Sequence, residues 1–451
     1  MKKEVDLRND KVSTLLLTLA IPAILSQLVN ALYNMVDRMY IGHIENVGSL
    51  ALTGVGVCFP LIMIVSAFAS LVGMGGAPRA SIFMGKQDNK SAEKIMGNCF
   101  VSLVFISLLL TGVLLLFNEP LLRLFQASDN TLPYASSYLK IYALGTIFVQ
   151  MTLGMNAFIS TQGFSKISMM TVCIGAISNI ILDPILIFGF NLGVSGAALA
   201  TVLSQAISAI WVIRFLFGDK TILKLRKENF KIDFSLLLPS LALGISPFIM
   251  QSTESLLTLC FNMQLSRFGG DLALGAMTIL SSIMQFCMMP LQGITQGGQP
   301  IISYNYGAQN GSRIKEAFKL QTLSCVAYST LIWGMVQLFP SLFIQIFTND
   351  AALLEISTWA IRIYMATVLL MGIQISCQQT FIAFGNAKIS IFLAIFRKII
   401  VLIPLIFILP CILENKVFAV FLAEPIADFI AVSMTATLFY FNFKKIMKSI
   451  S

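Results

Sequence analysis

The sequence contains little charge for its length. Only 11% of its 451 residues are charged, against about 25% in a typical soluble domain, and 57% are hydrophobic. Apolar runs of about 20 residues recur along the chain, as they do in proteins with many membrane-spanning helices. The composition therefore predicts an all-α integral membrane protein in a lipid bilayer and argues against a soluble domain.

Histidine is almost absent, since His43 is the only one, and this excludes a histidine metal site or a catalytic triad. The eight cysteines form no Cys-x-x-Cys pair and mostly fall inside apolar runs, so we expect reduced, buried thiols. The chain also has no Gly-x-x-x-x-Gly-Lys-Ser/Thr phosphate loop. These absences favour a protein that is not an enzyme and has no cofactor.

A compact basic patch is also missing. The net charge of +9 is spread over the ends of apolar spans, which argues against a nucleic-acid partner. The polar start and the apolar run after it could pass for a secretory signal, but the run is long, contains Pro22 and is followed by no cleavage pattern. We interpret it as the first permanent span.

Twelve apolar runs predict twelve transmembrane helices. Their limits are 13–37, 50–74, 95–117, 135–160, 168–190, 195–217, 235–262, 273–297, 317–339, 356–382, 389–411 and 417–441. With the N-terminus in the cytoplasm, 24 lysines and arginines fall on the cytoplasmic side and 6 outside, which predicts two cytoplasmic termini. The polar stretch 218–234 is predicted to link two six-helix lobes, 1–217 and 235–451.

The two predicted lobes are related by an internal repeat with a constant offset in residue number. The offset places "GMGGAPRAS" from Gly73 on "TQGGQPIIS" from Thr295, and "GFSKIS" from Gly163 on "GNAKIS" from Gly385. Because each lobe has an even number of spans, both have the same orientation, which predicts a pseudo-two-fold axis along the membrane normal. Duplicated bundles of this kind are typical of secondary transporters, which are driven by an ion gradient or by downhill flow of the substrate.

Asp183 is the only charged residue among the 47 from Ile167 to Ile213. Asn179 precedes it by four residues and shares its helix face, and Pro184 after it cannot donate a helical N–H. A carboxylate, an amide and a freed carbonyl together suit a hard cation or a proton relay. The alternative is a kinked helix whose carboxylate bonds to neighbouring helices.

Other acidic residues in the spans are also candidates. Asp37 follows Asn30, Tyr33 and Asn34 at helical spacing, and it is either functional or an interfacial pair with Arg38. Glu254 stands alone in span seven. Glu424 and Asp428, four residues apart in span twelve, either bond across helices or act in transport.

The chain resembles the multidrug and toxin extrusion (MATE) family, and within it most of all the bacterial DinF-like branch. The resemblance covers essentially the whole chain and rests on these motifs: "LYNMVDRMYIGH" in span one, "GGAPRAS…MGKQD" and "GGQPIIS…YGAQN" after spans two and eight, "SNIILDPILIFGF" in span five and "AEPIAD" in span twelve. It implies export of cationic amphipathic compounds in exchange for protons or sodium.

The resemblance also implies site residues. A proton or Na⁺ is expected at four N-lobe residues, which are Asp37, Asn179, Asp183 and Thr201. The substrate cavity is expected to include Asn30, Tyr33, Asn34, Asn156, Gln205, Glu254 and Gln285. Glu254 matches an acidic residue of the other main branch, but span ten has no acidic residue after Glu355, so that second site looks incomplete. Arg38 departs from the small or apolar residue expected after Asp37.

The sequence therefore favours a cation-coupled drug antiporter that works by alternating access, as a monomer in the inner membrane. The alternative is a lipid or oligosaccharide flippase of the same wider superfamily. A flippase for anionic carriers would line its cavity with arginines, whereas these spans look short of buried arginine and hold carboxylates. A membrane enzyme or channel lacks a supporting motif.

Overall fold

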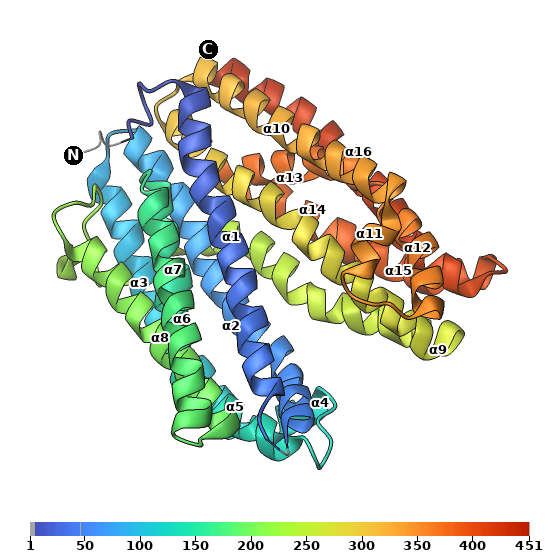
Figure 1. The fold of residues 1–451 in the computed structure, drawn as a ribbon. Helices are drawn as coiled ribbons and strands as arrows, with labels where there is room; N and C mark the ends of the chain where they lie inside the picture. Colours follow the sequence, from blue (N-terminus) through green and yellow to red (C-terminus); the bar gives the residue numbers. More distant parts are fainter. Residues whose placement is uncertain (1–4, 46, 451) are drawn as a thin grey trace. The chain divides into compact units, whose positions relative to one another are not determined.

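A computed structural model describes residues 5–45 and 47–450, and the described residues form helices and no strand. The elements in chain order are α1 (Val12–Gly42), α2 (Gly48–Gly85), α3 (Asn89–Leu116), α4 (Asn118–Leu124), α5 (Leu132–Leu144), α6 (Thr146–Thr161), α7 (Ser165–Pro184), η1 (Ile185–Gly189), α8 (Gly193–Phe217), η2 (Lys227–Asn229), α9 (Phe234–Gly307), α10 (Gly311–Leu338), α11 (Pro340–Gln345), α12 (Ala351–Tyr364), α13 (Val368–Ala383), α14 (Ala387–Ile395), η3 (Phe396–Leu402), α15 (Ile403–Ile412) and α16 (Lys416–Ile450). Figure 1 shows their course.

The predicted twelve spans are confirmed. Eight helices are long and apolar enough to cross a membrane, and the bent pairs α5–α6 and α12–α13 each complete one more. The 74-residue α9 counts once among the eight but is two helices joined at Gly270, whose φ of 59° and ψ of −156° only glycine adopts readily. The less apolar α10, with 28 residues, is the remaining span. The chain is a multi-pass membrane protein.

The helices divide into two compact units. Of the described residues, unit 1 contains 5–8, 25–45 and 47–251, and unit 2 contains 9–24 and 252–450. The start of α1 therefore packs with unit 2, and the start of α9 with unit 1, although each helix continues in the other unit. The lobe boundaries expected from the sequence stay a prediction.

The internal repeat extends to backbone conformation. Gln87 and Gln309, which the offset of the repeat pairs, both have a positive φ, of 63° and 56°. The next residue in each case, Asp88 or Asn310, caps a helix by accepting a backbone N–H three residues on, from Ser91 or Arg313. The same offset relates the start of α6 to that of α13, and the start of α7 to that of α14. The two halves thus fold alike as far as the middle of span five.

Close helix packing follows the same repeat. A Cβ atom on Gly75 would lie 2.1 Å from the Ser240 carbonyl oxygen in unit 1, so only glycine allows α2 and the start of α9 to approach this closely. Its repeat partner Gly297 plays the same part in unit 2, where a Cβ atom would lie 2.5 Å from the backbone of Ala20 on α1. In each unit, a glycine therefore allows close packing against the start of a helix whose remaining residues belong to the other unit.

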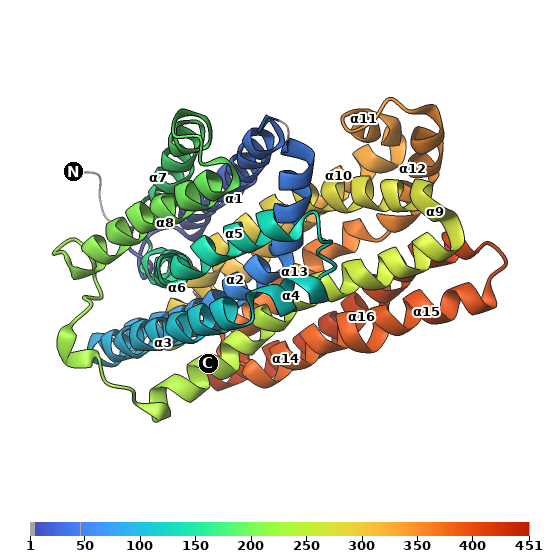
Figure 2. The ribbon, with the colours of Figure 1, turned by 90° about the horizontal axis from the view of Figure 1, so that it is seen from below.

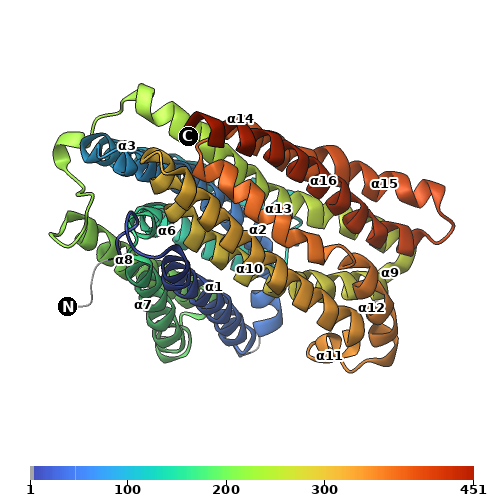
Figure 3. The same cartoon turned by 90° about the horizontal axis from the view of Figure 1, so that it is seen from above.

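Within each unit, consecutive spans pack side by side. In unit 1, α7 lies against α8, and α6 contacts both (Figure 1). In unit 2, η3 and α15 follow each other along α16 (Figure 2), and α10 packs against α13 (Figure 3). All eight cysteines are free, and six of them are buried, which fits the expected small apolar role.

The polar stretch 218–234 is bound to unit 1 along its length. The side chain of Glu93 on α3 accepts the backbone N–H of Lys224 at 3.0 Å and the Nε–H of Arg226 at 2.8 Å. The Gln162 side chain accepts another N–H of this stretch at 2.7 Å. The stretch is thus an ordered strap on unit 1 rather than a loose tether.

Candidate functional site

Asp183 lies where span five changes its winding. The Asn179 Nδ2 donates to Asp183 Oδ1 at 3.2 Å, as their spacing predicts, and both residues are fully buried. Pro184 has no N–H, yet the chain does not break there. It continues as the π-helical turn η1, in which the Phe190 N–H donates to the Ile185 carbonyl at 2.9 Å. Such turns are frequent at functional sites.

Asp37 on α1 meets this pair. The carboxyl groups of Asp37 and Asp183 lie within hydrogen-bonding reach of each other, and Tyr33, one turn before Asp37, lies near both. Asp37 is also buried. Two negative charges this close repel each other unless a proton or a cation lies between them. The pair therefore suits an exchangeable positive charge.

Three oxygens of this cluster are buried and have no hydrogen-bond partner: Oδ1 of Asp37, Oδ1 of Asn179 and Oδ2 of Asp183. Buried polar atoms in folded proteins are nearly always paired, so three unpaired acceptors in one cluster require an explanation. No ion pair among the described residues involves either aspartate. The set fits a small cation or a proton that the protein does not itself provide.

Thr201 on α8 is linked to this cluster through Tyr138. It hydrogen-bonds Tyr138 of α5, and Tyr138 in turn lies close enough to Asp37 to interact with its charge. The sequence did not single out Tyr138, because it falls in an apolar run that reads as ordinary packing. Its stacking on Tyr142, at a ring distance of 6.4 Å and one helical turn away, is the pattern that could have drawn attention to it.

Arg38 does not form the interfacial pair with Asp37 that was one alternative. Its guanidinium lies 4.9 Å from the centre of the Phe59 ring, and no ion pair joins it to Asp37 in the described part of the chain. Helical geometry explains the separation, because adjacent residues on a helix point about 100° apart. Arg38 is exposed, whereas Asp37 turns inward.

The other predicted cavity residues of unit 1 are Asn30, Asn34, Asn156 and Gln205. Asn34 Nδ2 donates to the Asn30 carbonyl at 2.7 Å, one turn back along α1. The buried Gln205 Oε1 has no partner and lies one turn from Thr201. Asn156 is held elsewhere. Its Nδ2 donates to Ser168 Oγ at 2.9 Å, near the start of α7 and about 16 Å along the helix from Asn179.

Unit 2 holds its acidic residues differently. Arg397 on η3 donates from Nε to Asp428 Oδ1 at 2.7 Å and from Nη2 to Glu424 Oε1 at 3.1 Å. The next residue, Lys398, donates to the Glu254 carboxylate, and the lysine is buried while 63% of the Glu254 side chain is exposed. Of the two possibilities for Glu424 and Asp428, the structure contains the bonds across helices.

One expectation about unit 2 is wrong. Arg397 and Lys398 were assigned to the cytoplasmic side and instead lie inside span eleven, where Lys398 is buried and Arg397 is partly buried, so 22 rather than 24 basic residues are predicted on that side. The physical reason is that Glu424 and Asp428, four residues apart on α16, offer one guanidinium two carboxylates. Gln285, the last predicted cavity residue, is exposed on α9.

The chain is similar to known proteins in sequence and in fold. The chain is 26% identical over 421 residues to multidrug export protein MepA of Staphylococcus haemolyticus (strain JCSC1435), a match that covers 93% of this chain and 92% of that protein. It is 33% identical to the MATE multidrug transporter DinF-BH, with a TM-score of 0.89 and 98% of both chains covered. A MATE structure in the bent conformation matches at a TM-score of 0.93, with 99% of this chain and 100% of that chain covered; at 20% identity, this shows the fold alone.

A profile of the MatE family matches residues 22–185 and 247–408, which together span most of both halves of the chain. The matched ranges contain Asp37 and Asp183 in the first half and Arg397 in the second. The resemblance drawn from the motifs of spans one, five and twelve is thereby confirmed. The chain belongs to the MatE family of multidrug and toxin extrusion transporters.

Proposed function

We propose that this protein is a cation-coupled antiporter that exports cationic amphipathic drugs, with a proton or Na⁺ bound at Asp37, Asn179, Asp183 and Thr201. The observation that carries the proposal is the set of three buried, unpaired oxygens on the first three of these residues. Carboxylate, amide and hydroxyl oxygens are the ligands that hard cations prefer, and a carboxyl pair can equally hold a proton. No further cofactor is required.

Coupling follows if the cation and the drug favour different conformations. A ligand shifts a conformational equilibrium only by its difference in affinity between the two states. With a cation present, Asp37 and Asp183 are held together, so α1 is fixed against α7. Without it, their mutual repulsion favours separation and a different position of α1. Because residues 9–24 of α1 pack in unit 2, a movement of α1 would reach both units, as alternating access requires.

Export of drugs is supported by the name of the MepA relative, a multidrug export protein, and a preference for cationic compounds is supported by the buried carboxylates of the chain. The two basic residues inside span eleven of unit 2 do not change this preference. Arg397 and Lys398 face three carboxylates, those of Glu254, Glu424 and Asp428, so the cluster has a net charge of −1. We therefore favour an antiporter over a flippase for anionic lipid carriers. We also propose a monomer with both termini in the cytoplasm.

The test is transport of a fluorescent cationic dye into inside-out vesicles, where export appears as accumulation in the lumen, with separately imposed proton and sodium gradients. We expect at least one gradient to drive accumulation of the dye, and Asp183→Asn to remove that effect while the protein still folds. Which gradient works identifies the coupling ion. If neither gradient drives dye movement in vesicles that contain folded protein, the antiporter proposal is wrong.

A further inference from the structure

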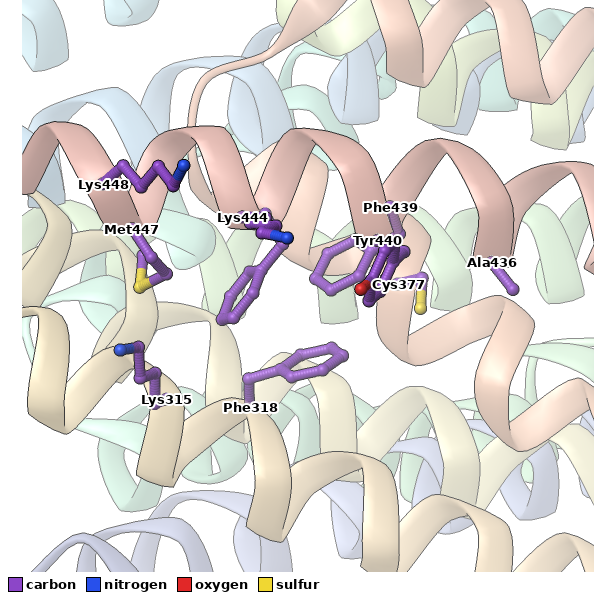
Figure 4. A pocket seen from close by; sticks show the side chains of 10 residues that line it. Lys315, Phe318, Cys377, Ala436, Phe439, Tyr440, Lys444, Met447 and Lys448 are labelled. Atoms are coloured by element: carbon purple, nitrogen blue, oxygen red, sulfur yellow. The ribbon is translucent and has the colours of Figure 1, made fainter.

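A groove in unit 2 is unrelated to the acidic clusters. It lies between the first turns of α10 and the last turns of α16, has a volume of about 540 Å³, and has Cys377 of α13 at one end. Both α10 and α16 pack against α13. Figure 4 shows side chains of α10 and α16 facing each other across the groove.

The middle of the groove is aromatic. The ring of Phe318 on α10 stacks on Phe439 of α16 at 4.5 Å and lies 5.2 Å from Phe443. Tyr440, on the same side of α16, is 63% exposed. Exposed tyrosine is common where a membrane helix meets the lipid–water boundary. An apolar chain would therefore find a continuous apolar surface here.

One end of the groove is basic. Lys315 of α10 and Lys448 of α16 lie at this end with Met447, while Ala436 and Cys377 lie at the other (Figure 4). Lys444 contributes a third ammonium group, 6.0 Å from the centre of the Tyr440 ring. Of the 10 residues that line the groove in the described part of the chain, none is acidic. All three lysines are exposed.

The length of the groove fits one leaflet of a membrane. From Ala436 to Lys448 is 12 residues, which corresponds to about 18 Å along a helix. Half of a bilayer's hydrocarbon core is about 15 Å thick. With the C-terminus in the cytoplasm, as the distribution of basic residues predicts, the lysines lie at the headgroup level of the cytoplasmic leaflet, which carries the anionic lipids.

We propose that this groove is a binding site for one anionic phospholipid of the cytoplasmic leaflet. Its phosphate is held by Lys315, Lys444 and Lys448, and one acyl chain lies along Phe318, Tyr440 and Phe443. Basic pockets between membrane helices on this side bind acidic headgroups. Three ammonium groups disfavour a cationic drug, and they would repel the same three groups on a second copy of the chain.

The test is native mass spectrometry of the purified full-length protein, delipidated in detergent and offered phosphatidylglycerol or phosphatidylcholine. We expect one phosphatidylglycerol to be retained preferentially, and Lys315→Gln/Lys444→Gln/Lys448→Gln to weaken its retention by at least about tenfold. The matched control removes three exposed lysines outside the groove, as Lys90→Gln/Lys388→Gln/Lys445→Gln, and should retain the lipid.

A second variant separates a lipid from a free phosphate. Ala436→Phe fills the apolar end and leaves every lysine in place, so it should also weaken retention of phosphatidylglycerol. Soluble glycerophosphate should compete poorly, because it lacks the acyl chain. The proposal is overturned if both lysine triples lose the lipid equally, if phosphatidylcholine is retained as well as phosphatidylglycerol, if Ala436→Phe has no effect, or if the groove variants change only the proportion of dimer.

Discussion

The two units treat their buried acidic side chains in opposite ways. In unit 1, Asp37 and Asp183 face each other with unpaired oxygens and no basic partner among the described ion pairs. In unit 2, Arg397 bridges Glu424 and Asp428, and Lys398 holds Glu254. One duplicated fold thus contains a compensated cluster in one half, where every carboxylate has a basic partner, and an uncompensated cluster in the other, where no ion pair is formed among the described residues.

The difference begins at one place in the repeat. The helices that start at Ser165 and Ala387 are related by the offset of the repeat, but the π-helical segments that follow are not, since one occupies 185–189 and the other 396–402. At this offset, Gly175 and Ala176 occupy the places of Arg397 and Lys398. The two halves therefore differ in the position of the π-helical segment in the same region where they differ in basic residues.

The largest expected effect comes from breaking the compensated cluster. Arg397→Met leaves two buried carboxylates without their partner, and the free energy of unfolding should fall by about 3–5 kcal/mol. The measurement is unfolding of the purified protein in detergent. The triple variant Arg397→Met/Glu424→Gln/Asp428→Asn removes all three charges and should recover most of the loss. Equal instability of the single and the triple variant would show that shape, rather than charge compensation, matters here.

The uncompensated cluster should respond in the opposite way. Asp183→Asn removes a repulsive charge, so stability should change little, while gradient-driven dye efflux should fall by about 100-fold because the cation and drug are no longer coupled. The matched change in unit 2, Glu424→Gln, leaves the Arg397–Asp428 bond and should preserve efflux. If efflux survives Asp183→Asn and fails with Glu424→Gln, the functional roles of the two units are reversed.

The Lys398–Glu254 pair allows a smaller and asymmetric test. Glu254→Gln leaves a buried ammonium without its carboxylate and should cost about 2 kcal/mol of unfolding free energy. Lys398→Met leaves only an exposed carboxylate, which water can solvate, and should cost less. Thermal melting of both variants measures the order. The opposite order would mean that Glu254, rather than Lys398, is the member that depends on the pair.

The smallest effect concerns the matched helix caps. Asp88→Ala and Asn310→Ala should each cost about 1 kcal/mol. The Ser91 side chain and N–H hold the pKa of the Asp88 carboxyl below its usual range, so this stabilisation is complete above about pH 4 and is lost as the pH falls through the lowered value. Solvent screening keeps the pH effect small. The cost of Asn310→Ala should not vary with pH over this range, and unfolding measured from pH 7 to pH 3 tests the contrast.

Most of the fold could be predicted from the sequence because membrane spans and turn motifs are local patterns. The repeat also paired the motifs after spans two and eight, where the structure contains matched helix caps. The pairing of Asn179 with Asp183 also followed from their spacing on one helix. The grouping of Asp37 with these two residues did not follow from spacing and was expected only from a family resemblance. Contacts between helices depend on packing, which a one-dimensional pattern does not contain.

The errors have the same origin. Arg397 and Lys398 were assigned to the cytoplasm because basic residues usually lie at the end of a span. Only the carboxylates that they contact on α16 and α9 make a position inside the span favourable. The sequence did not single out Tyr138 for a similar reason. Its bond to Thr201 depends on how α5 meets α8, which no local pattern specifies.

The division of α1 and α9 between the units has a consequence for how such a chain could arise by duplication. A single ancestral half, equivalent to one copy of the repeat, would lack the helix start that completes its packing. It could obtain one only from a second copy, as in a domain-swapped dimer. Fusion of two copies would then have made that exchange permanent. By the same reasoning, the two halves expressed as separate chains should fold together rather than alone.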